Sequence, residues 1–216
     1  MKRRAGVDLW RHERRLWDSG HVLVAGLDEA GRGPWAGPVV AAAVILDPEQ
    51  APDGIYDSKA LTPKHRDALY KGICRAAVAF SVGSVERELI DRINILEATR
   101  LAMLRALEAL RQSPHALLVD ALRIPQTNLP QYPLIKGDQL SVSIAAASIV
   151  AKVTRDRLMT RYETEFPGYG FAAHKGYGTP QHRKALFEMG PCPLHRRSFR
   201  PVRQLILARE LGIPGS

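Results

Sequence analysis

The stretch LVAGLDEAGRG, residues 23–33, places an apolar run directly before two adjacent acids and a glycine-rich turn. A short apolar run bounded by glycine is typical of a buried strand, and we predict the first strand at HVLVAGL, residues 21–27. Asp28 and Glu29 then follow the strand end, and the glycines after them let the backbone turn sharply. A fold alone seldom requires two acids in this position, so the stretch is a candidate working site.

Outward from this stretch, the chain alternates apolar runs with helical patterns. Thr62 and Pro63 form a good helix start, as N-cap and first helical residue. Strands are predicted at 39–46, 78–85, 115–120 and 132–136, and helices at 62–77, 86–111 and 139–165, with one or two more helices after residue 166. The order predicts an α/β layered domain with a helical tail.

Composition limits the class of protein. The 216 residues suit one fair-sized domain, and 45% hydrophobic with 25% charged residues is ordinary for a globular protein. No apolar run approaches the ~20 residues needed to span a bilayer, and the N-terminus has no apolar segment of a secretory signal. Cys74 and Cys192 provide no disulfide framework, which favours a reducing cytoplasm.

The net charge of +9 and the pI near 9.9 favour a polyanionic partner, with nucleic acid first and an anionic membrane second. Residues 174–203 hold seven Lys and Arg against the single acid Glu188, with Tyr177 and Phe199 among them. Cations neutralise phosphates and aromatic rings stack on sugars or bases. The alternative interpretation of this basic stretch is a solvated helical face.

Two further acids occur at informative positions. Asp120 closes the fourth predicted strand, and Asp156 in the long helix shares the face of Ile149 and Val153, which predicts that it points to the core. Each acid alone would ordinarily cap a turn or pair with an arginine. Together with the pair after the first strand they converge if the two strands are neighbours. Oxygen-only ligands suit Mg²⁺ and Mn²⁺, and a basic protein with an acidic cluster suits two-metal phosphodiester cleavage.

Other motifs give weaker signals. Gly31, Arg32 and Gly33 allow close backbone approach to a phosphate or ribose, although Pro34 excludes the dinucleotide-binding fingerprint. The loop DSKALT carries Lys59, which contacts either phosphate or solvent. His174, His182, His195 and Cys192 match no structural zinc spacing well, and no nucleophile-elbow motif is present.

Several blocks, in order, resemble the motifs of bacterial ribonuclease HII. They are DEAGRGPWAGPVVAAAVIL, DSKALT, INILEATRLAM, LLVDA, IKGDQLSVSIAAASIVAKVTRDR and FAAHKGYGTPQH…GPCPLHRRSF, and the likeness covers roughly residues 20–203. Ala121 departs from the family pattern, where glycine is commoner after the LVD acid.

The resemblance implies a ribonuclease H fold, with a central mixed five-stranded sheet flanked by helices and a C-terminal helical extension. We accordingly divide the chain into a basic N-terminal extension (1–20), a ribonuclease H-like catalytic domain (21–165), and a loop and helical extension that contributes to substrate binding (166–216).

The resemblance also implies an endonuclease that cuts the RNA strand of RNA–DNA hybrids and single ribonucleotides embedded in duplex DNA. Cleavage falls 5′ to the ribonucleotide and leaves a 3′-hydroxyl and a 5′-phosphate, with two Mn²⁺ or Mg²⁺ ions. The implied metal-binding carboxylates are Asp28, Glu29, Asp120 and Asp156. The implied substrate contacts are Gly31, Arg32 and Gly33 on the 2′-hydroxyl, Tyr177 on the neighbouring sugar, and Lys59, Lys136, Lys175 and Arg197 on the backbone.

Three expectations concern partners and alternatives. Nothing in the sequence demands more than a cytoplasmic monomer. The segment RQLILARE, residues 203–210, faintly resembles a sliding-clamp peptide, although an ordinary amphipathic helix is the favoured interpretation. Alternative functions are another nuclease of the same fold, such as a junction resolvase, and a non-catalytic RNA-binding protein with structural acids.

Overall fold

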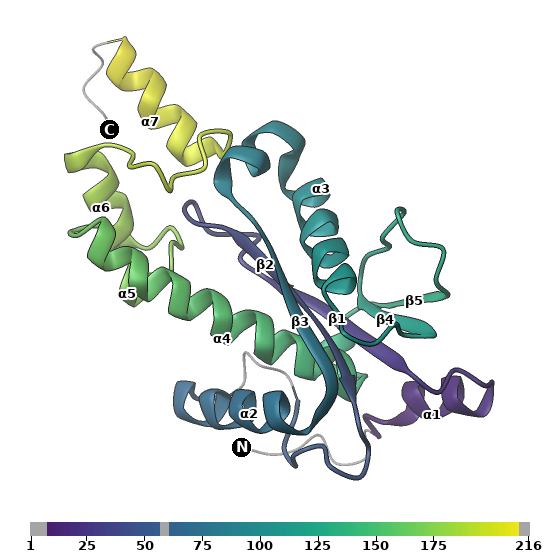
Figure 1. Cartoon of the computed structure of the whole chain (residues 1–216). Helices are drawn as coiled ribbons and strands as arrows, with labels where there is room; N and C mark the ends of the chain where they lie inside the picture. The colour runs from purple at the N-terminus through teal and green to yellow at the C-terminus, as the bar shows by residue number, and fades with distance from the viewer. Residues whose placement is uncertain (1–7, 57–60, 212–216) are drawn as a thin grey trace.

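The computed structural model describes residues 8–56 and 61–211, which form a sheet with helices on both faces and a group of helices beyond one end (Figure 1). The elements are α1 (Arg11–Asp18), β1 (Val24–Ala30), β2 (Val39–Leu46), α2 (Pro63–Ala76), β3 (Ala77–Val85), α3 (Arg87–Glu108), β4 (Ala116–Asp120), β5 (Gln131–Leu134), the 3-10 turn η1 (Gly137–Gln139), α4 (Val142–Glu165), α5 (Phe171–His174), α6 (Pro180–Met189) and α7 (Arg200–Glu210).

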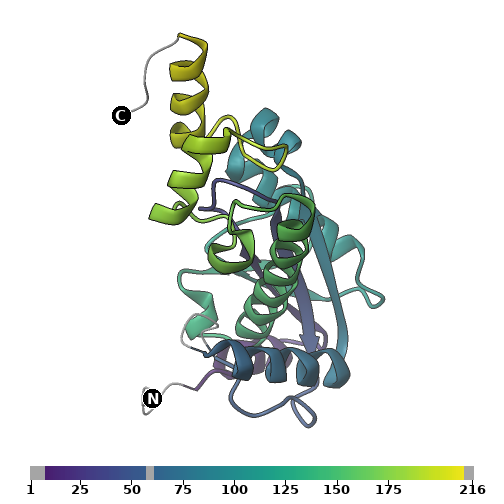
Figure 2. The same cartoon turned by 90° about the vertical axis from the view of Figure 1, so that its left-hand side faces the viewer.

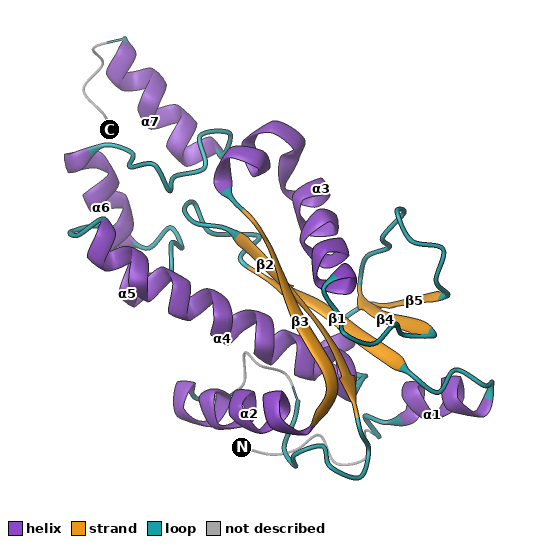
Figure 3. Ribbon diagram, in the orientation of Figure 1, coloured by secondary structure: helices purple, strands orange, loops and turns teal. Residues whose placement is uncertain are grey.

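The sheet has five strands in the order β3-β2-β1-β4-β5 (Figure 3). β1, β2 and β3 pair antiparallel, whereas β4 pairs parallel with both β1 and β5. The predicted mixed five-stranded sheet is therefore confirmed. The central strand β1 therefore lies between β2, its antiparallel neighbour, and β4, its parallel neighbour.

The β2 strand shows how the core is divided between the two faces of the sheet. Its predicted bounds, 39–46, agree with the structure, and all eight residues are buried. Successive strand residues point to opposite faces. Ala41, Ala43 and Ile45 pack in the cluster on the α3 side, while Ala42 and Val44 pack in the cluster on the α2 and α4 side. A strand covered on both faces is apolar throughout for this reason.

The small residues at the start of α4 let this helix approach the sheet closely. A Cβ added at Gly26 in β1 would lie 2.1 Å from the backbone carbon of Ser143, so only glycine fits there. Ser143 and the alanines that follow it are buried. The predicted long helix is confirmed, but it begins at Val142 because η1 occupies the residues before it.

The prediction for the end of the first strand was wrong. β1 continues to Ala30, where it still pairs with Val40, so Asp28 and Glu29 lie inside the strand and not after it. Backbone pairing with β2 outlasts the apolar pattern, because a ladder hydrogen bond does not depend on the side chain. β5 covers 131–134 instead of 132–136, since Lys136 adopts a left-handed conformation with φ 58°.

The predicted helix 86–111 is a kinked helix with bounds Arg87–Glu108. Asn94 has φ 68° inside it, and its side-chain oxygen accepts hydrogen bonds from the amides of Leu96 and Glu97 at 2.9 and 3.1 Å. Asn94 thus caps a second helical segment within α3.

The predicted helix start at Thr62 is confirmed in α2, because the Thr62 hydroxyl accepts a hydrogen bond from the His65 amide at 3.3 Å.

The predicted N-terminal extension contains α1, which packs against the first turn of α4. The carboxylate of the buried Glu13 accepts from the Ser141 hydroxyl at 2.5 Å and from the Ser143 amide at 3.1 Å. Burial raises the pKa of Glu13. None of the described helices is long and apolar enough to cross a membrane.

The C-terminal region comprises α5, α6 and α7, and α6 and α7 lie beyond the end of α4 (Figure 2). This region is tied to the loop between β1 and β2 by an isolated β-bridge between Ala36 and His195. The chain therefore returns from its C-terminal part to the stretch that follows the two acids of β1.

Candidate functional site

Asp28 and Asp120 are brought together by the register of two parallel strands. β1 and β4 pair from Val24 with Ala116 to Leu27 with Val119, so the next residue of each strand is an aspartate at the same edge and on the same face. The side chain of Asp28 is 4% exposed. Burial, and then the charges of Glu29 and Asp120, raise the pKa of Asp28 well above its usual range.

Hydrogen-bond donors hold both aspartates in place. Ser148 of α4 donates to the Asp28 carboxylate, and the Glu29 amide donates to Asp28 Oδ1 at 2.7 Å. The amide of Gly137 in η1 donates to Asp120 Oδ1 at 2.7 Å. The two carboxylates are therefore fixed from the strand, from α4 and from η1.

Glu29 belongs to the same cluster by charge but lies on the other side of its strand. It pairs in register with Ala41, whose side chain is on the α3 face, while Asp28 pairs with Ala42 on the α4 face. The Glu29 carboxylate lies 3.4 Å from the guanidinium of Arg32 and is 11% exposed.

Asp156 is not directed to the core, and this prediction was wrong. Its side chain is 22% exposed and forms ion pairs with Lys152 at 2.7 Å and Arg66 at 3.8 Å. The buried position belongs to Arg155, which is 1% exposed. Towards its C-terminal end α4 leaves the sheet, and the buried stripe shifts to Ala151, Arg155 and Met159, which face other segments.

Asp138 is a buried acid that was not among the predicted site residues. It lies in η1 directly after Gly137, the residue that binds the Asp120 carboxylate, and it is only 3% exposed. The signal that could have found it is its place near the start of the block IKGDQLSVSIAAASIVAKVTRDR, just before α4. The structure thus puts a buried carboxylate one residue from the acidic cluster.

The glycine turn has a buried and an exposed part. Gly31 is buried with φ 98°, and an added Cβ would lie 2.1 Å from Nε of Arg155, so both conformation and space require glycine. Arg32 and Gly33 are exposed. An added Cβ at Gly33 would stand 3.7 Å from the ring of Tyr177, so this turn and this ring are neighbours.

Tyr177 is 45% exposed and its backbone segment is tied to the same turn. The amide of Trp35 donates to the carbonyl of Gly176 at 2.8 Å. A Cβ at Gly178 would lie 2.1 Å from the Trp35 ring, so the ring packs directly on that glycine. The predicted pair of substrate-reading elements, which are distant in sequence, thus lie side by side.

The predicted backbone contacts differ in their surroundings. Lys136 and Arg197 are exposed, whereas Lys175 is partly buried and its ammonium group donates to the Thr160 hydroxyl at 3.2 Å. Burial lowers the pKa of Lys175. Lys59 lies outside the described residues. Arg196 of the basic stretch is fully buried and so cannot be part of a solvated or phosphate-binding face.

The histidines form a buried, neutral hydrogen-bonded group. The Cys192 amide donates to Nδ1 of His195 at 3.0 Å, which leaves Nε2–H of His195 to donate to Nε2 of His182 at 3.0 Å. Nδ1–H of His182 then donates to the Tyr177 carbonyl at 2.9 Å. Burial lowers the pKa of His182 to about 4 and that of His195 to about 3.

A divalent cation fits the acidic cluster by the chemistry of its donors. The cluster offers only carboxylate oxygens, which suit hard ions. Burial and then the like charges of Glu29 and Asp120 raise the pKa of Asp28, and a cation would favour its charged form. As the side chains stand, no group of three or more His, Cys, Asp or Glu in residues 8–56 and 61–211 is arranged to hold an ion. Instead, the carboxylates of Asp28 and Asp120 accept hydrogen bonds from backbone amides, and that of Glu29 pairs with Arg32.

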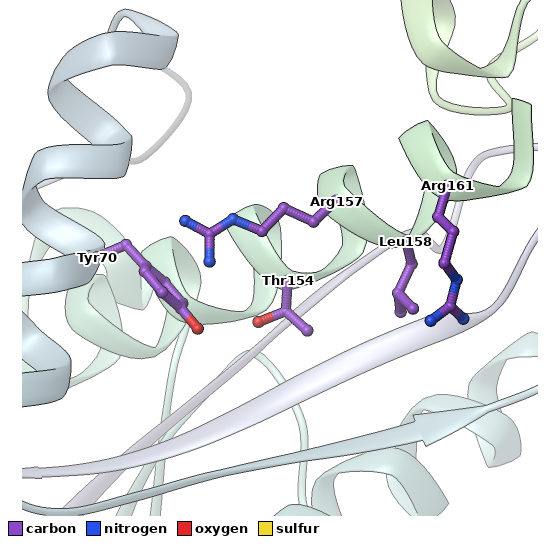
Figure 4. Close-up of a pocket in the computed structure, with 5 residues that line it drawn as sticks. All are labelled: Tyr70, Thr154, Arg157, Leu158 and Arg161. Carbon is purple, nitrogen blue, oxygen red and sulfur yellow. The ribbon is translucent and has the colours of Figure 1, made fainter. Parts of the chain in front are cut away.

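A pocket of about 310 Å³ lies between α2 and α4 and is lined by Tyr70, Thr154, Arg157, Leu158 and Arg161 (Figure 4). The Arg157 guanidinium stacks over the Tyr70 ring at 4.4 Å and pairs with Asp67 at 2.5 Å. None of the acids of the cluster lines this pocket. Its chemistry is therefore separate from the candidate site.

Comparison with known proteins identifies the family of this chain. A family model described as Ribonuclease HII matches residues 25–202. Ribonuclease HII of Syntrophomonas wolfei is 51% identical over 205 residues, which cover 95% of this chain and 80% of that protein. Ribonuclease HII of Chloroflexus aurantiacus is 54% identical over 203 residues, which cover 92% of this chain and 96% of that protein.

Solved structures agree with these relatives. The crystal structure of ribonuclease H2 from Pyrococcus horikoshii superposes with a TM-score of 0.71 at 28% identity, over 85% of this chain and 97% of that one. A PCNA:RNase HII complex from Archaeoglobus fulgidus has the same TM-score at 27% identity, over 83% of this chain and 96% of that one. The ribonuclease H-like fold predicted from the motifs is confirmed.

Proposed function

Because this chain belongs to the ribonuclease HII family and is a ribonuclease H endonuclease, we propose that it cuts the RNA strand of RNA–DNA hybrids and also single ribonucleotides embedded in duplex DNA. Cleavage falls on the 5′ side of the ribonucleotide and leaves a 3′-hydroxyl and a 5′-phosphate. The reaction uses two divalent ions, Mn²⁺ or Mg²⁺. The biological setting would be removal of ribonucleotides from cellular DNA.

The observation that carries this proposal is the adjacency of two chemistries. The carboxylates of Asp28 and Asp120 stand at one edge of the sheet, and the exposed glycine turn that follows β1 stands against Tyr177. The carboxylates that would bind the metal ions are thus followed, within a few residues of β1, by the turn that would contact the sugar.

Asp28, Glu29 and Asp120 are the residues that would hold the ions. Bound ions would activate water and stabilise charge on the scissile phosphate. The protein's own part is to hold the carboxylates: Ser148 and the Gly137 amide orient the two aspartates, and the sheet prevents them from moving apart. Burial and the neighbouring like charges raise the pKa of Asp28, and bound cations would offset both by favouring the charged carboxylate.

For the fourth carboxylate we propose Asp138 in place of Asp156, which the family resemblance implied. Asp138 is buried beside the residue that binds Asp120, while Asp156 is already neutralised by Lys152 and Arg66. The ion pairs of Asp156 reduce what this acid would gain from a metal ion, whereas the backbone of η1 places Asp138 next to the Gly137 amide that holds Asp120.

Two elements would contact the sugars of the substrate, the glycine turn after β1 and the ring of Tyr177. Gly31, Arg32 and Gly33 would contact the ribose 2′-hydroxyl, the group that distinguishes RNA from DNA. Tyr177 would stack on the neighbouring deoxyribose. The backbone contacts would come from Lys136, Lys175 and Arg197, together with Lys59, whose loop lies outside the described residues.

The test is a labelled DNA duplex with one embedded ribonucleotide, incubated with Mn²⁺ or Mg²⁺ and compared with an all-DNA duplex and a long hybrid. We expect a single cut 5′ to the ribonucleotide, cutting of the hybrid, and no cutting of the all-DNA duplex. A folded protein that leaves the embedded ribonucleotide intact with both metals would overturn the proposal for single ribonucleotides.

A sliding-clamp contact through residues 203–210 is a second proposal. These residues lie in the helix α7, in which Val202 is buried while Leu207 is 46% exposed. The Archaeoglobus relative was solved in complex with PCNA. Leu207→Ser should weaken capture of the bacterial clamp without changing cleavage of a short duplex. Unchanged capture, or none by the unsubstituted chain, would remove this partner.

A further inference from the structure

Two arginines are completely buried beside the glycine turn, and both bind backbone carbonyls. Arg155 of α4 is 1% exposed and donates to the carbonyls of Ala36, Pro38 and Lys175 at 2.9–3.0 Å. Arg196 is 0% exposed and donates to the carbonyls of Gly31, Arg32 and Gly37, at 2.6, 3.0 and 2.9 Å. Each guanidinium therefore uses its fork of donors on three peptide groups.

The carbonyls that Arg196 binds determine which way the neighbouring amides point. All described peptide bonds are trans, so the amide of one residue points opposite to the carbonyl of the residue before it. The carbonyls of Gly31 and Arg32 point inward to Arg196. The amides of Arg32 and Gly33 must consequently point away from the guanidinium, and both of these residues are exposed.

Each carbonyl bound by an arginine belongs to a peptide group that also has an amide. The two arginines differ in whether these amides have hydrogen-bond acceptors within the protein. For Arg155, the amide of Gly37 donates to the Leu194 carbonyl and the amide of Gly176 to Nδ1 of His174. For Arg196, no acceptor for the amides of Arg32 and Gly33 is present within residues 8–56 and 61–211. Arg155 thus closes a structural network, whereas Arg196 leaves two donors directed outward beside Tyr177.

We propose that Arg196 is a positioning residue for ribose recognition: by holding two carbonyls inward, it presents the Arg32 and Gly33 amides as fixed donors to the 2′-oxygen of the ribonucleotide. The inference deepens the proposed function and depends on it. It also explains why an arginine of the basic stretch is buried, where it cannot touch a phosphate.

The charge of Arg196 adds to its geometric role. A cation at the carbonyl end of a peptide group polarises that group and strengthens the hydrogen bond that its amide donates. Burial lowers the pKa of Arg196 to about 9, so it remains protonated at neutral pH. The Phe199 ring, 5.0 Å from the guanidinium carbon, covers it on one side.

The experiment compares Arg196→Lys with the matched control Arg155→Lys in the full chain. Lysine keeps the charge but cannot span three carbonyls with a planar fork. Affinity is measured in EDTA, without metal, for two duplexes that differ only by one ribonucleotide. We expect Arg196→Lys to lose about 5- to 10-fold of the preference for the ribonucleotide-containing duplex, the value of about one hydrogen bond.

The control separates positioning from stability. Arg155 is buried equally and binds as many carbonyls, so Arg155→Lys should lower the melting temperature as much but keep the preference within about twofold. An unchanged preference in Arg196→Lys would overturn the inference, as would equal losses in both variants. Equal binding of both duplexes by the unsubstituted chain would instead overturn the proposed reading of the 2′-hydroxyl, and the inference with it.

A measurement on the unsubstituted chain covers the case in which Arg196→Lys does not fold. The chain is labelled with ¹⁵N-glycine, and the Gly33 amide resonance is assigned by its loss in Gly33→Ala, where the added Cβ meets only ordinary contact with Tyr177. We expect a downfield amide shift on binding the ribonucleotide-containing duplex but not the all-DNA duplex. The same Gly33 spectrum with both duplexes would contradict the role of this amide.

Discussion

The end of β1 and the loop that follows it bury charge in opposite ways. At Asp28 the buried charge has like charges as neighbours, and the pKa of this carboxyl is raised well above its usual range. Around the loop that follows β1, Arg155 and Arg196 come from remote parts of the chain and are buried just as deeply, but each donates to three backbone carbonyls. One region keeps unfavourable charge in place and the other neutralises it with peptide dipoles.

The difference separates a reacting site from its support. A cluster of carboxylates is costly without a cation, which makes it receptive to divalent metal. A guanidinium satisfied by carbonyls gains nothing from a ligand and instead makes the backbone rigid. Substitutions in the acidic cluster should therefore change chemistry most, and those around the turn should change discrimination between substrates.

The largest effect is expected for Asp28→Asn. Turnover of the embedded-ribonucleotide duplex should fall by roughly 10³-fold or more, because Asp28 would hold the divalent cations that stabilise charge in the transition state. Duplex binding should change little, since the basic surface supplies most of the affinity. Single-turnover rates and fluorescence anisotropy measure the two quantities. Asp53→Asn, at an exposed acid, is the control, and a near-normal rate for Asp28→Asn would show that the metal assignment is wrong.

The next effect distinguishes the two candidates for the fourth carboxylate. Asp138→Asn should reduce the cleavage rate by about 100-fold, whereas Asp156→Asn should cost less than about tenfold, because Lys152 and Arg66 already neutralise Asp156. Rates over a range of Mn²⁺ concentrations provide the comparison. The reverse order of the two variants would restore Asp156 as the ligand.

Tyr177→Ala tests the exposed ring beside the turn. Cleavage at a lone ribonucleotide should fall by about tenfold more than cleavage of a long hybrid, since one stacking contact is worth about 1–3 kcal/mol. Tyr177→Phe keeps the ring and should retain most of the activity on both substrates. Equal losses on both substrates in Tyr177→Ala would remove the role of the ring at the junction between RNA and DNA.

The smallest effect concerns stability, and its pH dependence follows from the pKa of Asp28. This pKa is higher in the folded chain than in the unfolded chain, so folding is favoured while Asp28 is protonated. The benefit is complete below about pH 4, the unfolded pKa of an aspartate, and is lost as the pH rises through the raised folded pKa. At pH 7 without metal, Asp28→Asn removes the penalty and should melt higher, by about 2–4 °C per kcal/mol relieved.

Melting curves at pH 3.5 and pH 7 in EDTA check this expectation. The advantage of Asp28→Asn should be present at pH 7 and absent at pH 3.5, and Asp120→Asn should also melt higher at pH 7. Added Mn²⁺ should stabilise the unsubstituted chain more than either variant. Lower melting temperatures for both variants at pH 7 would contradict a crowded acidic cluster.

Local pattern was sufficient for much of the fold. The bounds of β2, the helix start at Thr62 and the α/β class all follow from periodicity and capping, which act over a few residues. The blocks that resemble ribonuclease HII predicted the mixed sheet. The end of β1 was missed because strand pairing continues past the apolar residues, and the kink in α3 was missed because Asn94 is ordinary in a helical pattern.

The candidate site also has features that follow from the sequence and features that depend on the tertiary structure. The sequence by itself determined that acids, a glycine turn and cations occur, and that nucleic acid is the partner that suits them. Only the tertiary structure decided that Asp120 lies beside Asp28, that Arg155 and not Asp156 is buried, and that Arg196 turns two carbonyls inward. Strand register and the burial of a charge depend on segments that are remote in the chain, and no local periodicity specifies what those segments will place around a given side chain.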